Sequence, residues 1–386
     1  MIYVCDPVVH EGLKSYVSYT VKGRLLSNYI IRRFSNFYAL RQKLVERWPG
    51  IYIPNIPPKK AVGNLEKEII QMRTRVLNLF CLKISQFQFI IESEEMKVFL
   101  MGEVEASKAI DNLPQLAYGE ILLRYKKAFT DYNDEYDIAS GKEKINTFFG
   151  FVKKALINLK NFKDVVYQTM VKKDQEIENY LTLIHVFEDY EKYTLMEYAN
   201  NDENKLVFFN PKNIELCEKI MSLKQNLKNP YASLNDWLED EVLDVEAMTE
   251  ALASLALLNE THDKLIAESE SLTQRISNLQ SNYSKIKLFF TMKTKEAAYD
   301  ELTKRKESIE ESIQSLNEVI KIASFRMEKY LEKFKIEKLE RYHNHLKAFS
   351  ELQKDNNINL DDLWQCVSRD RNLAMGVDLN LNNNNN

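Results

Sequence analysis

Glycine and proline are scarce in this chain of 386 residues, which has nine of the first and eight of the second. Together they make up about 4% of the residues, against roughly 12% in an average protein, and this excludes collagen-like and turn-rich all-β folds. The four cysteines lie far apart and form no CxxC pair. We therefore expect neither a disulfide framework nor a structural zinc site, and we expect a reducing, cytosolic setting.

Signals for membrane insertion and for catalysis are also missing. There is no signal-peptide pattern and no apolar run of about 18 residues, so any membrane contact should be made from the surface. The motifs GxGxxG, HExxH and GxSxG and the Walker loop do not occur. His343 and His345 are two positions apart and would lie on different helix faces, while His185 and His262 are isolated. We expect no enzyme, no metal site and no cofactor.

Charge is unevenly distributed along the chain. Residues 1–100 hold 15 Lys and Arg against 8 Asp and Glu, although the whole chain has a net charge of −4. Such a basic module suits phosphate-bearing partners, nucleic acid or anionic lipid. Six of the eight prolines precede residue 115, and neither Gly nor Pro occurs between Tyr231 and Met375. The pattern predicts a multidomain protein in which a small mixed domain precedes a long helical one.

The first domain is predicted to be α+β. Alternating β-branched and aromatic residues indicate strands, spacings of three and four indicate helices, and closely spaced prolines indicate an extended loop. In chain order the predicted elements are strands at 1–5, 16–22 and 27–33, a helix capped by Ser35 and running to Trp48, a proline-rich loop at 53–60, and a helix from Ile69 to Phe80.

The junction Arg32-Arg33-Phe34 carries the clearest chemical signal. An arginine fork matches a phosphate, and a neighbouring aromatic ring can cover the apolar face of a sugar. The proline-rich loop then presents Lys59 rigidly, and the following helix carries Arg73 and Arg75. Nucleic-acid binding fits less well, because this set of residues suits a compact phosphorylated headgroup and no nucleic-acid module is present, so no nucleic-acid partner is expected.

These three segments, in this order, resemble the phosphoinositide signature of PX domains, the lipid-binding modules of sorting nexins. The resemblance implies that Arg33 holds the 3-phosphate, Phe34 packs on the inositol ring, Lys59 reaches the 1-phosphate and Arg73 bonds the ring hydroxyls. Arg73 is favoured over Arg75 as the inward residue on its spacing to Phe80. The family often has an acidic residue where Asn36 stands, and the change removes one supporting ion pair.

A helix after Pro114 has two open interpretations. Its apolar stripe runs through Tyr118, Ile121, Tyr125 and Phe129. The helix could lie in a bilayer interface with Arg124, Lys126 and Lys127 toward lipid phosphates. It could equally be a linker helix that docks on a neighbouring domain.

Three long helices are expected at about 142–200, 212–288 and 294–354, with a kink at Pro230. In the third, apolar residues from Ile309 to Phe334 recur at alternating spacings of four and three. This is a heptad seam, which packs lengthwise on partner helices. Because one compact chain could not bury such a seam, we expect an elongated, antiparallel three-helix coiled-coil bundle that dimerises.

The length and position of this region, with the stretches 234–248 and 337–349 and Trp364, resemble the BAR domain that follows PX in one subclass of sorting nexins. BAR dimers present basic residues to anionic membrane. The predicted turn between the second and third helices is basic, and Lys153, Lys154, Lys172 and Lys173 could add to a concave side. The candidate membrane contacts at the turn are Lys285, Lys287, Lys293, Lys295, Lys304, Arg305 and Lys306. Solvated alternating charge remains the other interpretation of that turn.

The expected organisation is a PX domain at 1–105, a linker at 106–140, a BAR-like domain at 141–370 and a disordered Asn-rich tail at 371–386. The resemblance implies a PX-BAR sorting nexin that binds phosphatidylinositol 3-phosphate and anionic membrane. It would sense or induce curvature as a homodimer or as a heterodimer with another such nexin. It would act peripherally on endosomes in tubule and vesicle trafficking, with cargo or coat proteins as possible partners. The alternative is a coiled-coil tether or adaptor that is anchored by PX and does not bend membrane.

Overall fold

The structure is a computed structural model. It describes residues 1–12, 15–24, 26, 28–59, 65–101, 105–132, 136–198, 214–283 and 292–374, and the side chains in these ranges except those of 280–283, 292–296 and 369–374. The chain divides into two compact units. The first joins Met1–Ile157 to Asp240–Lys335, and the second joins Asn158–Glu239 to Ile336–Asn386. Within the described ranges, no helix is both long and apolar enough to cross a membrane.

The predicted three-stranded antiparallel sheet is confirmed. It consists of β1 (Ile2–His10), β2 (Tyr16–Gly23) and β3 (Ile30–Arg33) in the order β1-β2-β3. Strand β1 is longer than expected, because the register shifts between Cys5 and Val8 and lets the strand continue past Pro7. Because β1 is an edge strand, it can contain a proline without interrupting the hydrogen bonds between strands.

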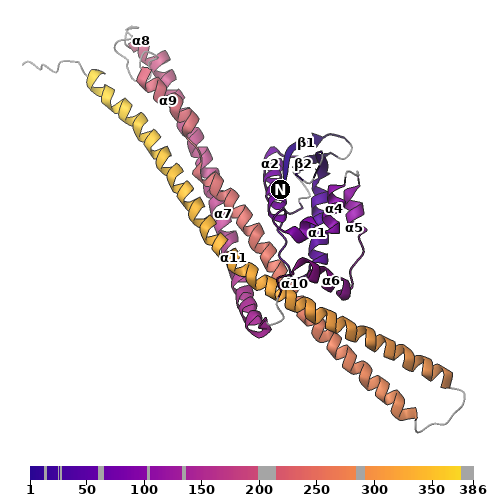
Figure 1. The fold of residues 1–386 in the computed structure, drawn as a ribbon. Coiled ribbons are helices and arrows are strands. Elements are labelled where there is room, and N and C mark those ends of the chain that lie inside the picture. Colours follow the sequence, from indigo (N-terminus) through magenta and orange to yellow (C-terminus); the bar gives the residue numbers. More distant parts are fainter. Residues whose placement is uncertain are drawn as a thin grey trace, which may run out of the picture. The chain divides into compact units, whose positions relative to one another are not determined.

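Short helices complete the first domain, and Figure 1 shows them around the sheet. Helix α1 packs on α4 and α5, and α2 packs on β1. The side chains of Tyr19, Phe37, Leu40, Leu77 and Phe80 are at most 1% exposed and form the core. Burial of each such side chain is worth about 1.5–3 kcal/mol. The helices are α1 (Phe34–Arg47), α2 (Lys67–Ile84), α3 (Gln88–Ile91), α4 (Glu94–Leu100), α5 (Ala106–Asp111) and α6 (Tyr118–Ala128).

The predicted Ser35 cap of α1 is wrong. The helix already begins at Phe34, and Asn36 in its first turn accepts a hydrogen bond from the backbone N–H of Arg33 at 2.8 Å. Asn36 is buried, with 7% of its surface exposed. The amide that departs from the family pattern therefore fixes the point where β3 becomes α1.

The helical remainder follows the predicted order with different ends. Its elements are α7 (Ile138–Tyr190), the π-helical turn η1 (Glu191–Leu195), α8 (Met196–Tyr198), α9 (Ile214–Asn226), α10 (Pro230–Tyr283) and α11 (Met292–Ala374). Helix α11 continues into the first four residues of the predicted tail, and the rest of that tail lies outside the described residues.

Pro230 separates two helices where a kink was expected. It is the first residue of α10, a position where a missing N–H costs nothing. The break before it is held by Asn356 of α11, which is 2% exposed. Its side-chain amide donates to the Lys228 carbonyl at 2.7 Å and accepts from the Lys228 N–H at 3.3 Å.

Most of the heptad seam of α11, from Leu316 onward, is buried within the chain itself. Leu316, Ile320, Ala323, Met327 and Phe334 are all at most 7% exposed. The expectation that a single chain could not cover this seam is therefore wrong, because α7, α10 and the first domain pack against it. Phe334, for example, meets Phe148 of α7 at 6.3 Å and Tyr52 of the first domain at 6.4 Å between ring centroids.

The first domain and the middle of the long helices share one compact unit. The Tyr52 hydroxyl donates to Asp244 of α10, and the Tyr52 ring stacks on Tyr330 of α11 at 4.6 Å. Gly50 has a positive φ of 78°, and a Cβ there would lie 3.3 Å from Leu255. The chain thus comes so close to α10 that a side chain at position 50 would crowd it. The predicted domain boundaries at residues 105 and 140 stay a prediction.

Candidate functional site

Arg32 and Arg33 end β3 and face opposite sides of the sheet. Arg32 is 3% exposed and donates to the backbone carbonyls of Phe99, Met101 and Ile31. Arg33 is exposed. This follows from the two-residue period of a strand, which sends neighbouring side chains to opposite faces. Arg32 therefore stabilises the fold, and only Arg33 is open to a ligand.

Arg33 lies over the ring of Tyr16, with its guanidinium carbon 3.5 Å from the ring centroid. The register explains the contact. Arg33 pairs with Ser18 of β2, and Tyr16 is two residues along the same face, which is within diagonal reach of a long side chain.

Arg73 of α2 is the buried member of the second arginine pair. It is 5% exposed, and its guanidinium lies 4.4 Å from the centroid of the Phe34 ring. Burial lowers the pKa of Arg73, and the nearby Tyr19 opposes that shift. Its Nε has no hydrogen-bond acceptor among the described residues. Arg75 instead pairs with Asp240 of α10, so the inward arginine is the one expected.

Lys59 is exposed at the end of the proline-rich loop. Its ammonium nitrogen lies 3.6 Å from the centroid of the Tyr38 ring. The loop is anchored by Arg41, whose Nε donates to the Pro54 carbonyl at 3.2 Å. Tyr38 follows Phe34 by one helical turn, so Lys59, Arg73 and Arg33 all lie around the first turns of α1.

Each of the three cations contacts an aromatic ring: Lys59 and Arg73 contact rings of α1, and Arg33 contacts the Tyr16 ring of β2. None of Arg33, Lys59 and Arg73 has a carboxylate partner among the described residues. Cations that are near one another and not neutralised attract a multiply charged anion. Guanidinium and ammonium groups are the usual phosphate ligands of proteins, so the site is suited to a compact phosphorylated group. No cluster of metal-ligating side chains occurs in the part of the chain that is described.

Comparison with known proteins agrees with this geometry. Residues 21–103 match the PX domain family. Sorting nexin 1 of Arabidopsis thaliana is 35% identical over 114 residues, which cover 27% of this chain and 28% of that protein. The vacuolar protein sorting-associated protein vps5 of Schizosaccharomyces pombe is 36% identical over 111 residues, or 26% of this chain and 19% of that protein. The matched stretches thus span less than a third of these relatives.

The long helices match a solved structure. The cryo-EM structure of the SNX-BAR Mvp1 tetramer superposes with a TM-score of 0.59 at 15% identity, covering 95% of this chain and 99% of that one. The chain thus contains a PX domain and shares the fold of that SNX-BAR structure. The predicted fold class, a PX domain followed by a BAR-type helical region, is confirmed.

The helix between the PX and BAR regions, α6, is docked on protein. Tyr125 is fully buried, stacks on Trp48 at 5.5 Å and donates its hydroxyl to the Pro49 carbonyl at 2.5 Å. Ile121 and Phe129 are at most 5% exposed. Of the two interpretations of this helix, the docked linker describes the structure, because its apolar stripe is already covered.

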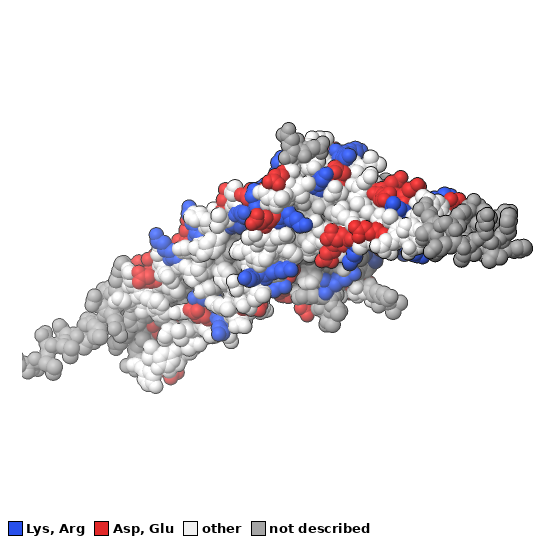
Figure 2. Space-filling model, turned by 90° about the horizontal axis from the view of Figure 1, so that it is seen from below, with Lys and Arg blue, Asp and Glu red and all other residues white. Residues whose placement is uncertain are grey.

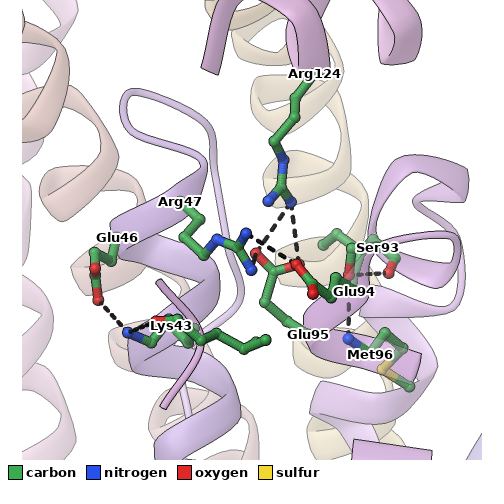
Figure 3. Close-up of polar contacts among 10 residues, drawn as sticks. Lys43, Glu46, Arg47, Ser93, Glu94, Glu95, Met96 and Arg124 are labelled. Carbon is green, nitrogen blue, oxygen red and sulfur yellow. Dashed lines mark hydrogen bonds and ion pairs between the residues drawn. The ribbon is translucent and has the colours of Figure 1, made fainter. Parts of the chain in front are cut away.

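Arg124 accordingly does not serve as a free membrane contact. Its Nη2 bonds both carboxylate oxygens of Glu95 at 3.0 Å, and its guanidinium lies 4.5 Å from the Trp48 ring centroid. Glu95 is fully buried and also pairs with Arg47 of α1 at 3.3 Å. Figure 3 shows this carboxylate between the two arginines. One buried charge therefore links α4, α1 and α6, while Lys126 and Lys127 remain exposed.

The candidate contacts of the helical turn are mostly outside the described residues or already paired. Lys285 and Lys287, and the side chains of Lys293 and Lys295, lie outside them. Arg305 pairs with Glu268 at 2.6 Å and Lys306 with Glu310 at 3.4 Å, whereas Lys304 is exposed. Figure 2 shows basic and acidic side chains interspersed over the described part of one face.

Sequence reasoning missed Tyr16, Tyr38 and Glu95. Tyr38 could have been found from its spacing of four after Phe34, which places both rings on one helix face. Tyr16 meets Arg33 only through the strand register. Glu95 meets Arg47 and Arg124 only through tertiary packing, and no local pattern marks either contact.

Proposed function

We propose that this protein is a PX-BAR sorting nexin, a peripheral membrane protein of endosomal trafficking. Its PX domain binds phosphatidylinositol 3-phosphate through Arg33, Phe34, Lys59 and Arg73. A BAR dimer senses or induces membrane curvature. The protein is not an enzyme in this proposal, and its partners are the phosphorylated headgroup, anionic membrane and a second PX-BAR chain.

One observation carries the headgroup assignment. The four residues that the PX resemblance singles out lie around one end of α1, and their three cations have no described carboxylate partner. The adjacent Arg32 instead donates its hydrogen bonds to backbone carbonyls of the protein interior. A 3-phosphate therefore has Arg33 available, and the ring beside it offers an apolar face to the inositol.

The dimer is supported by the second compact unit. Ile336, Leu339 and Leu346 of α11 are exposed by 57%, 72% and 46%, and Val165 of α7 by 62%. Apolar side chains that recur along helices and face solvent in one chain indicate a helix–helix interface. Two headgroup sites on one dimer would raise avidity by roughly 10²–10⁴ if both reach the bilayer.

Vesicle co-sedimentation with and without phosphatidylinositol 3-phosphate tests the headgroup site. Arg33→Ala should weaken binding by roughly tenfold or more, because it removes charge-assisted bonds to phosphate. Arg24→Ala is the matched control, since it removes one exposed positive charge from the same domain. A folded Arg33→Ala protein that binds as tightly as the Arg24→Ala protein would contradict the assignment.

The alternative function is a tether that PX anchors to the membrane without bending it. Electron microscopy of the same pellets distinguishes the two. Tubules that depend on the headgroup support curvature activity. Vesicles that bind protein and stay round would keep the PX assignment and favour the tether.

A further inference from the structure

Each of the three cations at the headgroup site rests on an aromatic ring. Arg33 lies on Tyr16 at 3.5 Å, Lys59 on Tyr38 at 3.6 Å and Arg73 on Phe34 at 4.4 Å. A ring face attracts a cation by about 0.5–2 kcal/mol and, unlike a carboxylate, leaves its charge in place. The rings therefore stabilise the three cations without neutralising them.

Other cations of the same domain are held differently. Arg41, Arg47, Arg75 and Lys83 pair with carboxylates. Such a partner would compete with a phosphate, because the ligand would have to displace it or tolerate its repulsion. Three of these pairs fasten the domain to α10, whereas the cations of the headgroup site rest on rings.

The Tyr16 ring is held in place by a second contact, with His10. The His10 imidazole stacks on it at 4.5 Å between ring centroids and 14° between planes, and His10 Nε2 lies 2.7 Å from the Ser18 hydroxyl. Two groups this close to one ring centroid must occupy its opposite faces. His10, Tyr16 and Arg33 therefore form a stack built on β1, β2 and β3. Tyr38 is fixed by its place on α1.

We propose that Tyr16 and Tyr38 are positioning residues of the headgroup site. Their rings hold Arg33 and Lys59 as uncompensated cations in the geometry that a phosphate-monoester headgroup needs. This rests on the function proposed above. In the absence of the rings both side chains would sample many rotamers, and binding would have to order them at an entropic cost.

Tyr16→Leu and Tyr38→Leu, compared with Tyr16→Phe and Tyr38→Phe, separate the ring from the hydroxyl. The readout is affinity for vesicles that contain phosphatidylinositol 3-phosphate, against vesicles of equal charge made with phosphatidylserine. We expect each leucine variant to bind the first vesicles roughly three- to fivefold more weakly, and each phenylalanine variant to stay within about twofold of wild type. Binding to phosphatidylserine vesicles should not change.

A nearly isosteric probe covers the case in which a leucine variant fails to fold. A trifluorinated phenylalanine at position 16 keeps the shape of Phe but withdraws charge from the ring face, and it should weaken binding relative to Tyr16→Phe. Equal affinity of these two proteins would overturn the proposal for Tyr16, and so would Phe variants as weak as the Leu variants. If wild type binds both kinds of vesicle equally, the headgroup function itself is refuted. The failure of the proposed function can therefore be told apart from the failure of the proposal for the rings.

Discussion

Two adjacent arginines of one sequence motif have unrelated roles. Arg32 satisfies three backbone carbonyls from the protein interior, whereas Arg33 faces solvent on a tyrosine ring. The pleat of β3 decides which is which. A change in strand register by one residue would exchange the two faces and bury Arg33.

Arg32→Ala should therefore destabilise the fold. It leaves the carbonyls of Phe99, Met101 and Ile31 without this donor, at a cost of about 1–3 kcal/mol in the free energy of unfolding for each that stays buried and unpaired. Arg33→Ala should change that free energy by about 1 kcal/mol or less, because it removes only an exposed contact with the Tyr16 ring. Chemical denaturation of both variants gives the comparison. Equal stability would contradict the assigned roles.

The site was partly predictable at this scale. Arg33, Lys59 and Arg73 were predicted as ligand contacts because each lies in a local motif, and that role stays a prediction. Helical spacing was enough to predict that Arg73 points inward. The rings of Tyr16 and Tyr38 were not identified as their supports. That information lies in the β2–β3 register and in where the loop of residues 51–59 lies, and both are set by tertiary packing.

Helix α6 illustrates the limit of pattern analysis for a single element. Its stripe of Ile121, Tyr125 and Phe129 fits a membrane interface and a protein interface equally well. The helix docks on protein because Trp48 and the buried Glu95, which are distant in the sequence, form a surface that covers this stripe. Amphipathicity shows that a face will be covered but does not show by what.

Breaking the Glu95 link should release α6. Glu95→Gln removes the carboxylate that pairs with Arg124, whereas Arg47 keeps its pair with Glu94. The uncompensated Arg124 should destabilise the docked position of α6. Hydrogen exchange at the amides of 118–128 should then accelerate. Lys126→Gln is the control, because that lysine is exposed on the same helix. Unchanged exchange in folded Glu95→Gln protein would show that the aromatic contacts alone hold the helix.

Acid should weaken the junction between the start of α7 and α11. The hydrogen bond from Lys144, at 2.5 Å, lowers the pKa of Glu328, and a bond from Tyr136 at 2.8 Å adds to this. A carboxyl whose pKa is lower in the folded state stabilises the fold above its unfolded pKa, and this contribution is lost as the pH falls through the folded pKa. The difference in Tm between wild type and Glu328→Gln should therefore shrink below about pH 4.5. A difference that is constant from pH 7 to pH 3 would argue against this contribution.

At the scale of the whole molecule, the seam that first suggested a dimer has a different role. Leu316 is fully buried within one chain, so a charge there would disrupt the fold of the chain and would say little about assembly. The exposed apolar residues of the second unit give a cleaner test.

Leu339→Glu should give a folded monomer. The side chain is 72% exposed, so the substitution costs the single chain little, yet it would bury a charge in a helix–helix interface. Light scattering should show half the mass of wild type, with helical content unchanged by circular dichroism. Asn344→Glu introduces the same charge at a nearby exposed position and should remain dimeric. If Leu339→Glu keeps the wild-type mass, the dimer interface lies elsewhere.

The order of domains was predictable and their packing was not. Proline and glycine placement separated a mixed region from a helical one, and periodicity found the long helices. The contacts of Tyr52 with Asp244 and Tyr330 link positions that are 192 and 278 residues apart, and no spacing rule relates such positions. Helix ends were missed for a similar reason, since α11 continues to Ala374 past the last residues of its apolar pattern.

The close approach at Gly50 has a consequence for chimeric proteins. Its N–H donates to Ser254 at 3.0 Å, and the neighbouring Tyr52 ring is 4% exposed because α10 and α11 cover it. A PX domain transplanted from a relative would meet those helices with foreign residues at positions 50 and 52. We expect such a chimera to fold well only if Asp244, Ser254, Leu255 and Tyr330 are exchanged with it.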